Sequence, residues 1–178
     1  MRDMRFELMT ERLLIKQLDI GLAQSIHACS LDEDNRRFMP DEVFERPDDA
    51  AEAIRHLMAF YGTTDGPLVY AVFLKDNTYI GHVEAVPMRF GRWEIGYHIT
   101  RPCTGCGYAS EAVAAFVPLM LRYLRISRID GICDAQNMAS RRVLEKCGFN
   151  LVFDGIAAYQ GRQAAIRKYT YTKSPSAP

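Results

Sequence analysis

The chain has 178 residues, 48% of them hydrophobic, and its 22 basic side chains balance its 22 acidic ones. This length fits one domain with one core. The balanced charge argues against nucleic acid as a partner. No apolar run approaches the length of about 18 residues that a membrane-spanning helix needs, which argues against a membrane. The 5 cysteines are an odd number in a chain too long to need disulfide bonds, and residues 1–10 lack the apolar segment of a signal peptide, so we expect a cytoplasmic protein.

The first third of the chain predicts one strand and two helices. Residues 11–18 have strand character, with apolar residues among charged ones. Two segments have the apolar spacing of a helix, each begun by an aspartate cap: residues 19–30, capped by Asp19, and residues 48–61, capped by Asp48. The polar residues 31–47 between them are expected to form a loop.

The rest of the chain alternates strands and helices. Three strands joined by short turns are predicted over residues 68–74, 79–86 and 93–100. A glycine-containing loop over residues 101–107 leads into a long helix over 108–124. A strand, a short amphipathic helix and two last strands are predicted over residues 128–134, 139–147, 149–154 and 164–172.

This order predicts an α/β domain of the α+β kind. Successive hairpins form antiparallel pairs, whereas a strand–helix–strand unit forms a parallel crossover. We therefore expect one central mixed sheet, mostly antiparallel and flanked by helices. We assign residues 1–173 to this single domain and residues 174–178 to a disordered tail.

The segment with the clearest chemical meaning runs from Glu94 to Ala112. A strand enters a loop that contains Gly105 and Gly107, and a helix begins immediately after it. The first amides of a helix have no acceptor within it and lie at the positive end of its dipole, and glycines let a phosphate approach the backbone closely. The layout predicts an anion site suited to a pyrophosphate; a Gly-x-Gly also serves elsewhere as a simple tight connection.

Other motifs fit this loop less well. No Gly-Lys-Ser/Thr follows, as a P-loop requires, and Ser110 occupies the third glycine position of a dinucleotide fingerprint. Cys103 and Cys106 have the Cys-x-x-Cys spacing of a redox pair or of half a zinc site, but no second such pair supplies the remaining zinc ligands. We expect no metal, and the two thiols remain candidates for a redox role.

Two motifs in register resemble those of the GNAT acetyltransferase superfamily. Residues 137–149 read N-M-A-S-R-R-V-L-E-K-C-G-F, which is similar to the superfamily signature N-x-x-S-x-x-x-L-x-K-x-G-F, and the glycine loop resembles its acyl-CoA motif. The opening T-E-R-L-L from Thr10 and the E-I-G-Y strand that ends at Tyr97 resemble the branch of ribosomal-protein N-terminal acetyltransferases (RimJ/RimL-like). The resemblance extends over residues 10–172.

The resemblance implies an acetyl-CoA-dependent N-acetyltransferase of GNAT-like fold. The strand that ends at Ile99 would splay from a parallel neighbour, and its backbone would bind the pantetheine arm like an added strand. Pro102 stands where the superfamily usually has Gln or Arg; because proline has no amide to donate, the phosphate cradle is expected at the amides from Thr104 to Tyr108. The implied cofactor-binding residues are Tyr97, His98, Ile99, Thr104, Gly105, Cys106, Gly107, Tyr108, Asn137, Ser140 and Arg142.

The chemistry of acetyl transfer selects candidate catalytic residues. The amine must be neutral, the carbonyl must be polarised, and the thiolate leaving group benefits from a proton. Glu94 is the first candidate for the general base and Glu84 the alternative, while Ser140 is the candidate acid and a backbone amide of His98 or Ile99 the oxyanion donor. Glu94 is also interpretable as a salt-bridged strand residue and Ser140 as a helix cap.

The expected acceptor is a primary amine, on a protein N-terminus or on a small molecule, and the enzyme is expected to be a monomer or homodimer. Residues 31–61 would cover the acceptor site. Candidate lining residues, each equally interpretable as a core residue, are Phe38, Met39, Phe44, Tyr61 and Trp93. A non-catalytic CoA-binding sensor or interaction module on the same fold is the alternative, and a nucleotide-binding domain is a third interpretation.

Overall fold

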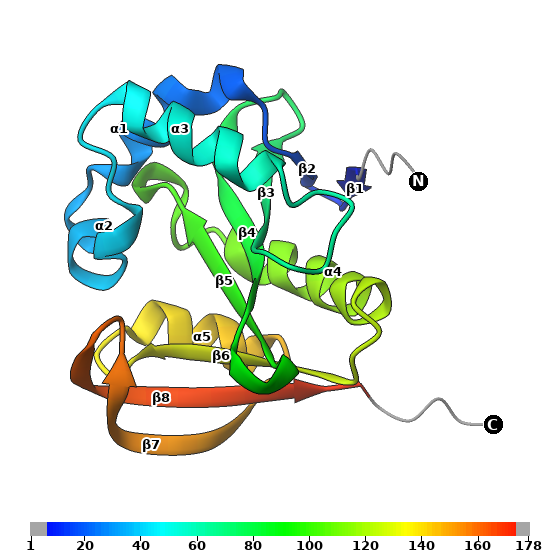
Figure 1. Cartoon of the computed structure of the whole chain (residues 1–178), viewed down its shortest axis with the longest axis vertical. Coiled ribbons are helices and arrows are strands. Elements are labelled where there is room, and N and C mark those ends of the chain that lie inside the picture. The colour runs from blue at the N-terminus through cyan, green and yellow to red at the C-terminus, as the bar shows by residue number, and fades with distance from the viewer. Residues whose placement is uncertain (1–6, 174–178) are drawn as a thin grey trace.

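A computed structural model describes residues 7–173, so the tail predicted at 174–178 lies outside the described residues. One sheet runs through the centre of the molecule, in the order β1-β2-β3-β4-β5-β6-β8-β7 (Figure 1). Its strands are β1 Glu7–Met9, β2 Leu13–Gln17, β3 Leu68–Leu74, β4 Tyr79–Pro87, β5 Trp93–Ile99, β6 Arg128–Asp134, β7 Asn150–Tyr159 and β8 Arg162–Thr172. Within the described part of the chain, β5 and β6 pair in parallel and the other neighbours are antiparallel.

Five α-helices and four short 3-10 turns complete the described chain. The helices are α1 Ala23–Ser30, α2 Glu33–Phe38, α3 Pro47–Met58, α4 Tyr108–Tyr123 and α5 Met138–Lys146. The 3-10 turns are η1 Ile20–Leu22, η2 Pro40–Glu42, η3 Arg89–Gly91 and η4 Arg101–Cys103. None of the described helices combines the length and the apolar character needed to cross a bilayer.

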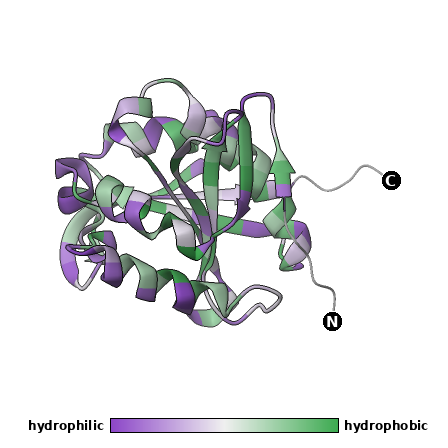
Figure 2. Cartoon of the chain, turned by 90° about the horizontal axis from the view of Figure 1, so that it is seen from above, coloured by the Kyte–Doolittle hydropathy of each residue, from purple (hydrophilic) through white to green (hydrophobic). Residues whose placement is uncertain are grey.

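Helices cover both faces of the sheet because β3 is apolar on both sides. Its alternate residues Leu68, Tyr70 and Val72 belong to the cluster that packs on α4. The residues between them, Val69, Ala71 and Phe73, pack with side chains of α1 and α3. Seen from above, hydrophobic strands lie between helices whose outward sides are hydrophilic (Figure 2). The predicted single mixed sheet flanked by helices is confirmed.

The feature that shapes the site is the divergence of β5 from β6. β5 pairs with β4 along its whole length, from Trp93 to Ile99. With β6 it shares a single ladder position, Glu94 opposite Asp130, and the two strands then separate (Figure 1). The splayed parallel pair implied by the resemblance is therefore present, and the backbone of β5 beyond Glu94 has a free edge toward the gap.

Two predictions in the N-terminal third are wrong. Residues 31–47 are not a plain loop but contain α2 and η2, because the Asp32 carboxylate accepts the amide of Asn35 at 2.9 Å and so begins a helix. Asp48 does not cap α3. That helix begins one residue earlier at Pro47, which suits the first helical position because its missing amide would have had no acceptor there.

The C-terminal hairpin is longer than predicted. β7 continues to Tyr159 and β8 begins at Arg162, joined by a turn in which Gln160 and Gly161 both have positive φ. The predicted strands ended at 154 and began at 164, since the small residues between them show no clear alternation. The short strand β1 was also missed.

Candidate active site

The glycine loop forms an open cradle of amides at the start of α4. Gly105 and Gly107 adopt the left-handed conformation, with φ of 77° and 84°, and Gly107 is the N-cap of α4 without a side chain capping the helix. Among the described residues, the amides from Gly105 to Tyr108 have no acceptor. A Cβ at Gly105 would meet nothing within 4 Å. The loop thus suits an anion such as a phosphate.

The cradle is shorter than the sequence suggested. The amide of Thr104 donates to the carbonyl of Arg101 at 3.2 Å, and its hydroxyl donates to the same carbonyl at 2.8 Å. The expectation that the Thr104 amide is free for a phosphate is therefore wrong, because η4 closes on it. In the same loop Cys106 is exposed and Cys103 is half-buried, and both are free thiols.

Arg12 connects the start of β2 to this loop, a contact that sequence reasoning missed. Its Nε lies 2.6 Å from Oε2 of Glu111 on α4, and its Nη1 donates to the carbonyl of Cys106 at 3.0 Å. Its guanidinium carbon stands 4.6 Å from the ring centre of Tyr108. Thr10 adds a bond of 2.6 Å to Glu111. These contacts hold the loop and bring a positive charge to the amide cradle; the T-E-R-L-L motif was the available signal.

A pair of hydroxyls lies on the α5 side of β5. Oη of Tyr97 is 2.9 Å from Oγ of Ser140 and donates to the Ser140 carbonyl at 3.0 Å. Asn137 caps α5 by accepting the Ser140 amide at 3.0 Å, so the serine is the third residue of the helix and not its cap. Burial raises the pKa of Tyr97, and its phenol therefore stays protonated and able to donate.

Two carboxylates lie on the other face of the same strands. Glu84 on β4 is opposite Gly96 on β5, and its carboxyl group occupies the space that a Cβ at Gly96 would need. Burial and the nearby Glu42 raise the pKa of Glu84 to about 7. Burial, Glu84 and Asp130 raise the pKa of Glu94 to about 8. Both groups therefore change protonation near neutral pH.

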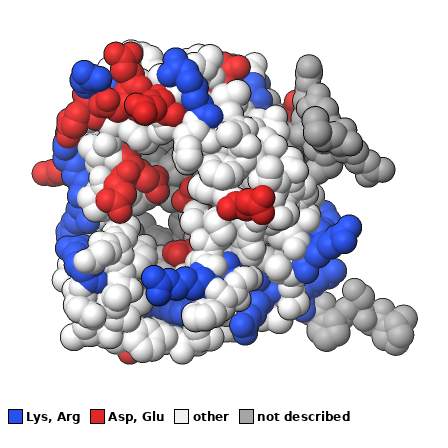
Figure 3. Space-filling model, in the orientation of Figure 1, with Lys and Arg blue, Asp and Glu red and all other residues white. Residues whose placement is uncertain are grey.

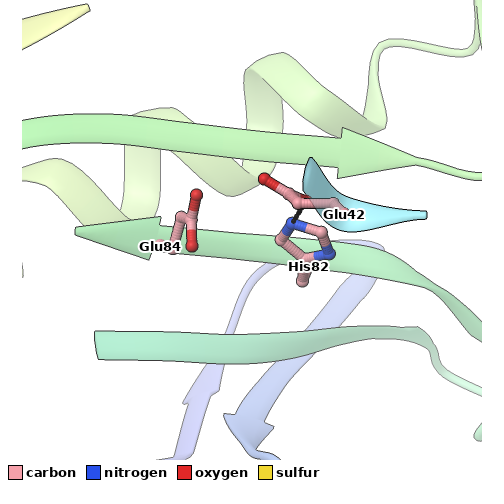
Figure 4. Close-up of side chains that lie close together, drawn as sticks. All are labelled: Glu42, His82 and Glu84. Atoms are coloured by element: carbon pink, nitrogen blue, oxygen red, sulfur yellow. Dashed lines mark ion pairs between the residues drawn. The ribbon is translucent and has the colours of Figure 1, made fainter. Parts of the chain in front are cut away.

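Two histidines extend this face, and α2 and η2 bring an acidic partner to each. Nε2 of His82 lies 3.2 Å from Oε2 of Glu42 (Figure 4), and Nε2 of His98 lies 3.7 Å from Oδ2 of Asp32. Burial and the neighbouring His82 lower the pKa of His98 to about 4, so it is neutral at pH 7. Burial opposes protonation of His82 as well, but the Glu42 carboxylate raises its pKa overall.

Comparison with known proteins decides the family. The family profile of the acetyltransferase (GNAT) domain matches residues 12–150. The chain belongs to the GNAT family. It is therefore an acetyl-CoA-dependent N-acetyltransferase.

Individual proteins are similar to this chain in sequence or in fold. An uncharacterized N-acetyltransferase of Bacillus subtilis, YoaA, is 28% identical over 165 residues, which is 91% of this chain and 86% of the relative. A GNAT-family acetyltransferase from Bacillus anthracis has the same fold, with a TM-score of 0.79, 24% identity and coverage of 94% of this chain and 98% of its own. RimL, a ribosomal L7/L12 alpha-N-protein acetyltransferase solved with coenzyme A, has a TM-score of 0.79 at 18% identity and covers 92% of this chain and 96% of its own.

The remaining predicted residues of the GNAT site divide into exposed, half-buried and core positions. Arg142 is exposed on α5, away from the core side of the helix, while Phe38, Met39 and Phe44 are half-buried in the segment that carries α2 and η2. Trp93, only 7% exposed, belongs to the core. Tyr61 also packs against the core, where its hydroxyl accepts the amide of Leu18 at 2.8 Å. For Tyr61 and Trp93 the structure therefore agrees with the core alternative.

Proposed function

We propose that this GNAT enzyme moves the acetyl group directly from acetyl-CoA to a primary amine, with both substrates bound together at the gap between β5 and β6. The observation that carries the proposal is the distribution of groups along β5. Glu94 and Tyr97 are three residues apart and so project from opposite faces of the strand. A base on one face and a hydroxyl donor on the other thus flank the gap.

The residues around the gap fit acetyl-CoA. The free amides from Gly105 to Tyr108 and the positive charge of Arg12 suit the diphosphate, and the free edge of β5 suits the amides of the pantetheine arm. Asn137 stands at the start of α5, beside Ser140. When bound, acetyl-CoA supplies the activated acetyl group as a thioester. A backbone amide of His98 or Ile99 is the proposed donor to its carbonyl oxygen.

Glu94 is the proposed general base, directly or through one water molecule. An amine with a pKa of about 10 is almost wholly protonated at pH 7 and must lose that proton before it attacks. A carboxylate whose pKa is raised to about 8 holds a proton far better than an ordinary one, and so accepts it more readily from an ammonium. Glu84 is the alternative base, with its pKa raised to about 7.

Ser140 is the proposed general acid. Its Oγ is hydrogen-bonded to the Tyr97 phenol at 2.9 Å, so the tyrosine orients the serine hydroxyl that would give its proton to the leaving thiolate. The structural alternative, that the serine merely caps α5, is not needed because Asn137 caps that helix.

We further infer that the enzyme belongs to the RimJ/RimL-like branch, which is supported by the T-E-R-L-L opening and by the fold shared with RimL. The test of the proposed function is a screen of acetyl-CoA consumption across peptides with free N-termini and small amines. Turnover of at least one amine, abolished by Glu94→Gln with acetyl-CoA binding intact, is the expected result. Tight acetyl-CoA binding without acetylation of any amine would instead favour a CoA-binding sensor.

A further inference from the structure

The face of β4 and β5 that carries Glu84 and Glu94 is the acceptor side of the gap, and it holds more negative charge than the chain itself compensates. We propose that the acceptor is a small molecule with at least two amino groups, a diamine or polyamine, whose second ammonium binds between Glu42 and Glu84 while the first reacts beside Glu94. This inference rests on the proposed function, because it takes Glu94 as the place where the reacting amine loses its proton.

The geometry of the second subsite matches an ammonium. The donor atoms of Glu42, His82 and Glu84 all lie within 4.8 Å of one another. Figure 4 shows Glu84 and His82 along β4, with Glu42 reaching from η2 to the imidazole. Among the described residues, no hydrogen bond satisfies the Glu84 carboxyl group. An ammonium has three N–H donors and bonds carboxylates at about 2.8 Å, so it bridges two oxygens that are this far apart.

The charges around this subsite are unbalanced. Asp32, Glu42 and the partly ionised Glu84 lie beside two imidazoles, and that of His98 is neutral at pH 7. The buried carboxylate of Asp130, by contrast, is already paired with Arg92 and Lys168 and accepts the Thr170 hydroxyl at 2.7 Å.

On the surface, acidic and basic side chains gather on opposite sides of a hollow. Figure 3 shows a hollow on this face of the molecule, with Asp and Glu side chains on its upper rim and inside it, and Lys and Arg below. Carboxylates partly removed from water without a partner are costly, and a bound cation relieves that cost. A neutral acceptor would leave the charge uncompensated.

The register of β4 and β5 sets the distance between the two amines. Glu84 is opposite Gly96, and Glu94 is two residues from Gly96, so the two glutamates are diagonal neighbours on one face. Diagonal neighbours on antiparallel strands are about 7–8 Å apart. At about 1.25 Å per bond, five or six bonds between nitrogens, as in a chain of four or five carbons, span about 6 to 7.5 Å, which is close to this separation.

A divalent metal is the competing occupant of Glu42, His82 and Glu84. The separation argues against it, because ligands at about 2.1 Å from zinc lie only about 3.4 Å from one another in a tetrahedron. Nε2 of His82 already lies 3.2 Å from Oε2 of Glu42, so this nitrogen has a partner without a metal ion. Three donors spread up to 4.8 Å apart would have to converge before they held such an ion.

The test compares 1,4-diaminobutane with 1-aminobutane as acceptors, using kcat/KM at saturating acetyl-CoA. We expect the diamine to be preferred by about tenfold or more, the worth of one favourable ion pair of about 1.4 kcal/mol. Glu42→Gln should remove most of that preference, so that the ratio of the two kcat/KM values falls toward one. Asp41→Asn is the matched control, because it removes one exposed charge from the same turn and should keep the preference.

Three outcomes overturn the inference. Equal kcat/KM for the two amines does so, as does a higher kcat/KM for a neutral peptide N-terminus than for the diamine. A diamine preference that disappears with EDTA and returns with Zn²⁺ shows a metal subsite instead. If Glu42→Gln does not fold, the ratio of the two amines with the unmodified enzyme decides alone. Failure of every amine to react, with acetyl-CoA still bound, refutes the proposed function itself and is thereby distinguishable.

Discussion

The hydroxyls of Tyr97 and Ser140, 43 residues apart in the chain, are hydrogen-bonded at 2.9 Å across the gap side of β5. The tyrosine projects from β5 and the serine from the first turn of α5, so the bond ties one arm of the splayed strands to the helix beside the other. It is the contact that orients the Ser140 hydroxyl for its proposed role as general acid.

Ser140→Ala should lower kcat by about 100-fold, a typical contribution of a general acid, and change acetyl-CoA affinity by less than about threefold. The reason is that an acid acts in the transition state and not in binding. Single-turnover kinetics and calorimetric titration with acetyl-CoA separate the two effects. Equal kcat in the variant and the parent would remove Ser140 from the mechanism; Ser110→Ala on α4 is a serine control outside the hydroxyl pair.

Gly107→Val should weaken acetyl-CoA binding by at least about tenfold, because a β-branched residue is strained at φ of 84° and its side chain enters the cradle, near Arg12. Gly62 also has φ of 84°, but a Cβ added there would meet nothing within 4 Å, so Gly62→Val imposes the same strain away from the site. Isothermal titration with acetyl-CoA gives the affinities of the two variants, which are then compared. Undiminished affinity in Gly107→Val would contradict the cradle.

Arg12→Lys should raise the Kd for acetyl-CoA by about tenfold although the charge is kept. A lysine lacks the planar fork with which the guanidinium bonds Glu111 through Nε and the Cys106 carbonyl through Nη1. Arg55→Lys on the exposed side of α3 is the control and should bind like the parent. Parent-like affinity in Arg12→Lys would mean that the positive charge alone matters. Parent-like affinity in Arg12→Ala would mean that neither the charge nor the guanidinium geometry matters.

The stability of the ligand-free enzyme should fall as the pH rises from about 5 to about 8. Glu94 binds its proton more tightly when folded, with a pKa of about 8 against 4.5 for an ordinary glutamate, so the folded state holds more protons in this range. Rising pH therefore favours the unfolded state until the folded group has also ionised. Melting temperatures of the parent and of Glu94→Gln check this: the variant should show a shallower decline. An equal decline of melting temperature with pH in both proteins would exclude Glu94 as the source of the pH dependence.

Local patterns were sufficient for much of the fold and for the cofactor loop. The strands from Leu68 to Ile99 and the helix after Gly107 were predictable because apolar periodicity and glycine placement act over a few residues. The segment containing α2 was not, since a helix of six mostly polar and charged residues has no apolar stripe and depends on the cap at Asp32. That error hid how Glu42 reaches the acceptor side.

The sequence by itself determined the family and the identity of the chemical groups, because both motifs are contiguous and their chemistry depends on residue type and spacing. Tertiary structure alone decided which groups meet. Arg12 and Glu111 are 99 residues apart, and Glu42 reaches His82 from another element. Strand register and helix packing set such contacts, and these depend on how the whole core is filled and not on any local pattern.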